Sequence, residues 1–181
     1  MFEDDDDYDL RSHEKLPVFI KAIELYNLVD SLLKGSNKED RVETQETKEH
    51  EEYMEHFFES SKDMMMANAM LIPAKIAGAE GGDIYDLRME NAAIIRKAAR
   101  EIITDARGLQ MSGFPDIEYL DLLRNEVDQF RVLFAKWVKT FDQENYIIDR
   151  WGLFNPPGVN YDDHDPDDDI PFNADDFLGD L

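Results

Sequence analysis

Cysteine is absent from the 181 residues of this chain, which excludes disulfide cross-links, thiol catalysis and cysteine-based zinc sites. The chain also contains no run of about 18 uninterrupted apolar residues, so we expect no membrane-spanning helix. Its first ten residues hold six acidic groups and no Lys or Arg, the opposite of a secretory signal or transit peptide. The sequence therefore predicts a protein of the cytoplasm.

Positive charge is scarce, because 42 Asp and Glu residues stand against 19 Lys and Arg and give a formal net charge of −23. Residues 1–10 and 151–181 together hold 15 acidic side chains and no Lys or Arg. Charge repulsion and proline both oppose a packed structure in such stretches. We therefore predict three parts: an acidic N-terminal tail over 1–12, a folded body over 13–150 and an acidic C-terminal tail over 151–181.

Within the body, apolar residues recur every three or four positions, which is the helical period, and no alternating strand pattern competes. The first helix is predicted from Pro17 to about Lys34, and the second from about Glu46 to Ala77. The third is predicted from Asp83, as its N-cap, to about Met111, and the fourth from near Asp116. Its apolar seam consists of Leu120, Leu123, Val127, Phe130, Phe134, Trp137 and Phe141. The fold class predicted is all-α, an antiparallel up-down four-helix bundle with extended acidic N- and C-terminal tails.

Two of these helices carry further signals. In the second helix, Pro73 predicts a kink or a short break. The stretch 64–72 is apolar nearly all round, so it predicts a centrally buried helix with its methionines filling the core. Those methionines are Met64, Met65, Met66 and Met70. In the first helix, Phe19, Ile23 and Tyr26 widen the apolar face beyond what a surface helix needs, so we expect another subunit to cover part of it.

A family resemblance lies in two segments of the body. The first is Leu16-Pro17-Val18-Phe19, followed by Ala22 and Leu25; the second is Leu71-Ile72-Pro73-Ala74-Lys75-Ile76-Ala77-Gly78-Ala79-Glu80-Gly81. Both are similar to segments of the four-helix proteins encoded within intervening sequences of bacterial 23S ribosomal RNA genes. The accessory variability determinant of diversity-generating retroelements belongs to the same superfamily. The resemblance covers about residues 16–140 and implies a homo-oligomer, typically a five-fold barrel, with nucleic-acid or reverse-transcriptase contact in the accessory branch.

Catalytic and metal-binding patterns are missing from the sequence. The four histidines form no Glu-x-x-His triplet of the di-iron type, and the Glu52 and His56 pair is what a glutamate-rich helix surface gives by chance. The alternation of Asp163, Asp165 and Asp167 resembles the start of a calcium loop but lacks its sixth-position Gly and twelfth-position Glu. No phosphate-binding Gly-rich loop with Lys and Ser or Thr is present. We therefore predict that the chain is not an enzyme and takes no cofactor and no metal.

The C-terminal tail combines acidic residues with large apolar side chains. The candidate partner-binding residues are Asp167, Asp168, Asp169, Ile170, Pro171, Phe172, Phe177 and Leu178. The stretch 167–172 resembles the acidic tip of bacterial single-stranded-DNA-binding proteins, which docks on partner proteins by its Pro-Phe end. Hydrophobic anchors in an acidic strand suit a basic groove on a partner protein. The alternative is a tail that only keeps the protein soluble.

One candidate basic patch is present, formed by Arg96, Lys97 and Arg100 on the third helix. It is a candidate nucleic-acid site, a set of ion-pair partners for neighbouring acidic residues, or a docking place for an acidic tail of its own oligomer.

The function predicted first is a non-enzymatic, self-associating bundle that acts as a protein-interaction or scaffold module through its acidic tails. Two alternatives stay open. One is an accessory protein that binds RNA, DNA or a reverse transcriptase, and the other is an acidic mimic of nucleic acid.

Overall fold

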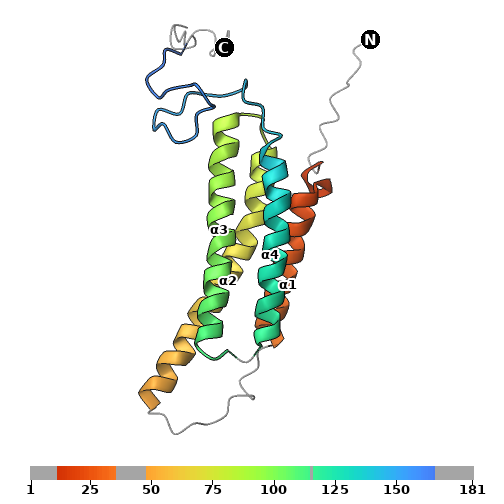
Figure 1. The fold of residues 1–181 in the computed structure, drawn as a ribbon, viewed down its shortest axis with the longest axis vertical. Helices are drawn as coiled ribbons and strands as arrows, with labels where there is room; N and C mark the ends of the chain where they lie inside the picture. Colours follow the sequence, from red (N-terminus) through yellow and green to blue (C-terminus); the bar gives the residue numbers. More distant parts are fainter. Residues whose placement is uncertain (1–11, 36–47, 115, 166–181) are drawn as a thin grey trace, which may run out of the picture.

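Four long helices make up the folded part of the chain. The computed structural model describes residues 12–35, 48–114 and 116–165 (Figure 1). Its elements are η1 (Ser12–Lys15), α1 (Pro17–Gly35), α2 (Lys48–Glu80), α3 (Tyr85–Met111) and α4 (Ile117–Val138). Each helix packs on its neighbours in the cyclic order α1, α2, α3, α4, and successive helices run in opposite directions. The predicted all-α, antiparallel up-down four-helix bundle is confirmed, and the described residues contain no strand.

The core follows the predicted apolar stripes of α1 and α4. In α1, the residues spaced four and three apart are at most 3% exposed; they are Val18, Ala22, Leu25, Val29 and Leu32. In α4, the predicted seam is buried except for the partly buried Phe134, and its last member, Phe141, lies just beyond the helix end. Burying a side chain of this size stabilises the fold by about 1.5–3 kcal/mol, so these two stripes provide much of the driving force for folding.

The second helix ends later than predicted and is unbroken at Pro73. It is described from Lys48 and runs to Glu80, through Pro73 and Gly78, so of the predicted kink or short break the break is absent. The predicted start near Glu46 lies outside the described residues. Pro73 removes one backbone hydrogen bond, but the side chains of Ile72 and Ile76 on either side of it are fully buried. Packing of these neighbours holds the helix across the gap, because tertiary contacts contribute more to helix stability than local propensity does.

The methionines of α2 do not all fill the core. Met65 is fully buried and Met66 is partly buried against the core, whereas Met64 and Met70 are 51% and 56% exposed. The expectation of a centrally buried helix is therefore wrong. Each helix of a four-helix bundle has two neighbours and always turns one side to solvent, even where its sequence is apolar all round.

The start of α3 is held by the chain that follows α4 and not by Asp83. Ile84 occupies the N-cap position without a side-chain cap, and the Asp83 carboxylate accepts a hydrogen bond from Arg88 instead, at 3.1 Å. The backbone N–H of Tyr85 donates to the carbonyl of Asn145 at 2.7 Å. The predicted Asp83 cap is therefore wrong, because a distant loop satisfies the helix terminus that a local side chain was expected to satisfy.

The segment that follows α4 crosses the end of the bundle at which α3 begins and α2 and α4 end (Figure 1). We predicted that residues 151–181 would be extended, and for residues 151–165 this is wrong. They form a series of turns held by hydrogen bonds, among them Val159 N–H to the Pro156 carbonyl at 3.1 Å.

Candidate protein-interaction surface

The segment after α4 is fixed to the start of α3 by side chains of both. Asn145 Nδ2 donates to the Asp83 carbonyl at 2.9 Å, and the N–H of Ile147 donates to the Asp86 carboxylate at 2.9 Å. The side chain of Ile148, between these contacts and Asp149, is buried at 9% exposure. This part of the chain is therefore seated on the bundle.

A cluster around Arg88 ties the ends of α2, α3 and α4 together beneath this segment. The Arg88 guanidinium pairs with Glu80 at the end of α2 and lies 4.2 Å from the ring centroid of Phe141, just after α4. Trp137 Nε1 of α4 donates to the same Glu80 carboxylate at 2.8 Å. A cation over an aromatic face adds to an ion pair when both are shielded from water, and the Arg88 side chain is only 11% exposed.

The carboxylate of Asp149 organises the next turn of the chain. It accepts backbone N–H bonds from Trp151, Leu153 and Phe154 at 2.8, 2.8 and 2.9 Å. The Asn155 side chain closes the turn by bonding both backbone groups of Asp149. Burial alone would raise the pKa of Asp149, but the three N–H donors outweigh it and the pKa lies below its ordinary value of 3.8.

A second set of hydrogen bonds holds residues 160–163 beside Arg150. Arg150 Nη1 donates to the carbonyls of Tyr161 and Asp163 at 3.0 and 2.7 Å. The Asp163 carboxylate accepts the N–H of Asn160 at 2.8 Å. Gly152 lies in the left-handed region, with φ of +71°, and a side chain at that position would contact Tyr161.

Four large apolar side chains project into solvent from this ordered scaffold. Trp151 is 89% exposed and Leu153 is 74% exposed, followed by Tyr161 at 60% and Ile147 at 54%. We call residues 146–161 the apolar loop. Exposed apolar patches on an ordered surface mark interaction sites, and Trp and Tyr are the side chains that most often dominate binding energy.

The apolar loop was not predicted, although the sequence carries a signal for it. Residues 151–161 contain no charged side chain, so they differ in composition from the acidic residues on both sides. They also contain Pro156, Pro157, Gly152 and Gly158, which are turn residues. The count of acidic residues over 151–181 as a whole does not reveal that residues 151–161 are uncharged.

The order of the apolar loop should depend on Asp149. In an Asp149→Ala variant, the amides of Trp151, Leu153 and Phe154 should exchange much faster with solvent, because their acceptor is gone. Because folding lowers the pKa of the Asp149 carboxyl, its ionised form stabilises the folded loop. This stabilisation is fully present at pH values above the pKa of Asp149 in the unfolded chain, and it is lost as the pH falls through the pKa in the folded state. We therefore expect the same amides to lose protection in the wild type under acid, below about pH 4.

Hydrogen exchange followed by NMR provides the measurement. Asp162→Ala is the matched control, because it removes the same charge from an exposed residue close by in the chain. Equal exchange of the three amides in wild type and Asp149→Ala would show that the carboxylate does not order the loop.

The residues predicted to bind partners fall in two places. The tail residues Asp167, Asp168, Asp169, Ile170, Pro171, Phe172, Phe177 and Leu178 lie outside the described residues. The predicted nucleic-acid residues Arg96, Lys97 and Arg100 are all exposed on α3. Lys97 pairs with Glu101 at 2.6 Å, one helical turn away, so for this lysine the ion-pair interpretation applies.

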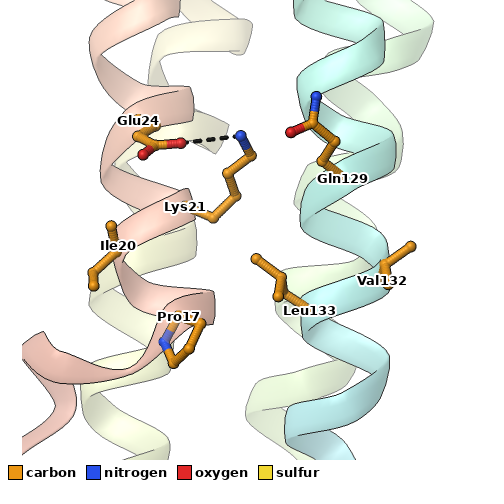
Figure 2. Close-up of a pocket in the computed structure, with 7 residues that line it drawn as sticks. All are labelled: Pro17, Ile20, Lys21, Glu24, Gln129, Val132 and Leu133. Carbon is orange, nitrogen blue, oxygen red and sulfur yellow. Dashed lines mark hydrogen bonds and ion pairs between the residues drawn. The ribbon is translucent and has the colours of Figure 1, made fainter.

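An apolar groove lies between α1 and α4 on the side of the bundle (Figure 2). It measures about 550 Å³ and is lined by Pro17, Ile20, Lys21, Glu24, Gln129, Val132 and Leu133. Lys21 reaches across it and pairs with Glu24 at 3.0 Å and with Glu126 of α4. Burial would lower the pKa of Lys21, but these two carboxylates outweigh it and raise the pKa. Lys21 therefore joins α1 to α4.

Metal binding finds no support in the part of the chain that the structure describes. No group of three His, Cys, Asp or Glu side chains there is placed to hold an ion. The hollow beside the apolar loop, of about 560 Å³, contains Asp163 and His164, but the Asp163 carboxylate is already bonded to Asn160.

Among the described helices, none combines the length and apolar character that crossing a membrane requires. In comparisons with known proteins, no family model, no curated protein and no solved structure matches this chain.

Proposed function

We propose that this protein is a non-enzymatic protein-interaction module that binds its partner through the apolar loop and the acidic tail that follows it. The observation that carries this proposal is the 89% exposure of Trp151 on a turn whose backbone N–H groups are held by Asp149. A preordered loop loses little conformational entropy on binding, so more of the burial energy of the indole contributes to affinity.

The charge around the loop indicates the kind of partner. Between residues 141 and 165 the chain has six acidic side chains and one basic residue, Arg150, whose guanidinium is bonded to backbone carbonyls. An apolar pocket rimmed by Lys and Arg complements this arrangement, with the pocket taking Trp151 or Leu153 and the rim attracting the carboxylates. The acidic residues 167–169 would extend the same contact along the partner's surface.

Substitution of Trp151 tests the proposal. The partner is first captured with immobilised full-length protein and identified, and its affinity is then measured for wild type, Trp151→Ser and Met111→Ser. Met111 is also 89% exposed but ends α3 at the opposite end of the bundle, so it is the matched control. We expect Trp151→Ser to weaken binding by about 30-fold, as a binding hot spot of roughly 2 kcal/mol does, and Met111→Ser to leave it unchanged. Equal affinity of the two variants would contradict the proposal.

Self-association remains part of the proposal. Its support is the apolar groove between α1 and α4 in Figure 2, two of whose lining residues, Ile20 and Val132, are 47% and 45% exposed. A second copy of this chain would cover that apolar groove, and a pentamer would agree with the family resemblance. Light scattering on the full-length protein gives the mass that decides between a monomer and an oligomer.

The nucleic-acid function has weaker support. Lys97, one of its three residues, is paired with Glu101. Phosphate binding also needs a concentrated basic surface, and the net charge of −23 repels a polyanion at long range.

A further inference from the structure

Three arginines of α3 form an exposed row. Arg96, Arg100 and Arg107 are spaced four and seven residues apart, so they lie on one side of the helix. All three are exposed, and no hydrogen bond or ion pair joins their guanidinium groups to any residue that the structure describes. The row therefore presents unneutralised positive charge.

The neighbouring helix α4 extends this row into a wider face. Arg124 donates to Gln110 of α3 at 2.6 Å, and Gln110 lies one turn after Arg107 on the same side of α3. Arg131 lies two turns further along the same side of α4 and is 70% exposed. Because α3 and α4 are antiparallel neighbours, Arg131 lies alongside the α3 row. We call Arg96, Arg100, Arg107, Arg124 and Arg131 the arginine face.

The arginine face carries a net positive charge. Arg124 pairs with Asp121, and Arg131 pairs with Asp128 at 2.9 Å. Five arginines against these two carboxylates leave an excess of three positive charges on a chain whose total is −23. Such a face attracts a flexible acidic ligand that can follow it along the helix axis.

The C-terminal residues of the same chain have the required charge and reach. Residues 166–181 contain six Asp and no Lys or Arg. The described chain stops at residue 165, at the end of the bundle where α3 begins (Figure 1). Arg96 lies about 17 Å and Arg107 about 33 Å along α3 from Tyr85, at 1.5 Å per residue. Sixteen residues span at most about 55 Å, which covers the whole face.

We propose that residues 166–181 dock on the arginine face of their own chain. A tethered ligand acts at an effective concentration in the millimolar range, whereas a nucleic acid in solution must overcome repulsion by the rest of the protein. Each exposed ion pair is weak, so docking depends on several of them together and on low salt. A partner with a basic groove would compete with the arginine face for the same carboxylates.

Paramagnetic broadening in the full-length protein tests this inference. Because the chain has no cysteine, an Ala174→Cys substitution gives a single attachment point for a spin label. We expect the label to remove amide signal intensity around Arg96, Arg100 and Arg107 but not on the exposed side of α1. Raising the salt to about 0.5 M should restore the signals, because the screening length then falls to about 4 Å.

Two double variants separate specific docking from general attraction. Arg96→Gln/Arg100→Gln should restore the α3 signals, whereas Lys34→Gln/Lys136→Gln removes the same charge from other faces and should leave the broadening in place. Broadening that survives the arginine changes, or that is absent in the wild type, overturns the proposal.

Two further measurements test whether a second copy of the chain or a nucleic acid, and not the chain's own residues 166–181, binds the arginine face. Broadening that appears between labelled and unlabelled chains in a mixed sample would assign the docking to a second copy and overturn the proposal. A short single-stranded DNA added at physiological salt should leave the broadening unchanged. If the DNA instead restores the signals by displacing residues 166–181, nucleic acid is the better occupant and the proposal is wrong.

Discussion

Replacing Phe130 with alanine should lower the free energy of unfolding by about 3–5 kcal/mol, the usual cost of emptying a buried aromatic site. Phe130 is 1% exposed and lies in the centre of the α4 seam. Its ring centroid is 6.0 Å from that of Phe134, which in turn lies 5.9 Å from Trp137. Alanine would remove one end of this aromatic row and leave a cavity that four long helices cannot collapse to fill.

Urea unfolding followed by circular dichroism measures this loss. Phe130→Leu is the smaller truncation; it keeps a branched apolar side chain in the site and should therefore cost clearly less than Phe130→Ala. Lys136→Ala, at an exposed position of the same helix outside the groove, should change stability by no more than about 0.5 kcal/mol. If Phe130→Ala cost as little as Lys136→Ala, the seam of α4 would not be the centre of the core.

Replacing Arg88 with methionine should cost about 2–3 kcal/mol and also loosen the segment after α4. The change keeps most of the side-chain bulk but removes the partners of Glu80 and Asp83 and the cation over Phe141. Removing one member of a buried ion pair costs about 3–5 kcal/mol, and the partial exposure of Glu80, at 20%, reduces that figure. Trp137 alone would then remain bonded to the Glu80 carboxylate.

Two measurements distinguish this cluster from an ordinary surface ion pair. Urea unfolding gives the global loss, and amide exchange at Tyr85 and Ile147 reports whether the segment still rests on α3. Arg131→Met is the matched control, since its pair with Asp128 is about 70% exposed at both side chains and should contribute below about 1 kcal/mol. Arg88→Lys should not restore full stability, because an ammonium lacks the planar guanidinium that lies over the Phe141 ring while its nitrogens pair with Glu80 and Asp83. Equal losses for Arg88→Met and Arg131→Met would refute this role of Arg88.

The helices and their buried sides were predictable because helical periodicity is a local property of the sequence. The α1 stripe and the α4 seam are confirmed almost residue by residue, since side chains three and four positions apart necessarily share a side. An error occurs where a distant contact replaces a local one. The first turn of α3 lacks the predicted Asp83 cap, because the carbonyl of Asn145 accepts the N–H of Tyr85. At Pro73 the helix continues without a break, because the neighbouring Ile72 and Ile76 are buried.

The apolar loop was not predicted. The sequence placed partner binding in residues 167–178, which lie outside the described residues, so that assignment stays a prediction. It did not single out Trp151 or Leu153, because their presentation depends on three N–H bonds to one carboxylate, Asp149, and on contacts with α3. Such bonds join backbone groups whose positions no sequence period fixes.

The sequence by itself determined an all-α bundle, the sides of the helices that form its core, and the concentration of acidic charge towards both ends of the chain. Each of these follows from composition or from spacing within one helix. The tertiary structure alone decided that Arg124 and Arg131 of α4 join Arg96, Arg100 and Arg107 of α3 in one face, and that the apolar loop rests on the start of α3. Both depend on which helices become neighbours and in which register, and packing of the whole core sets that register.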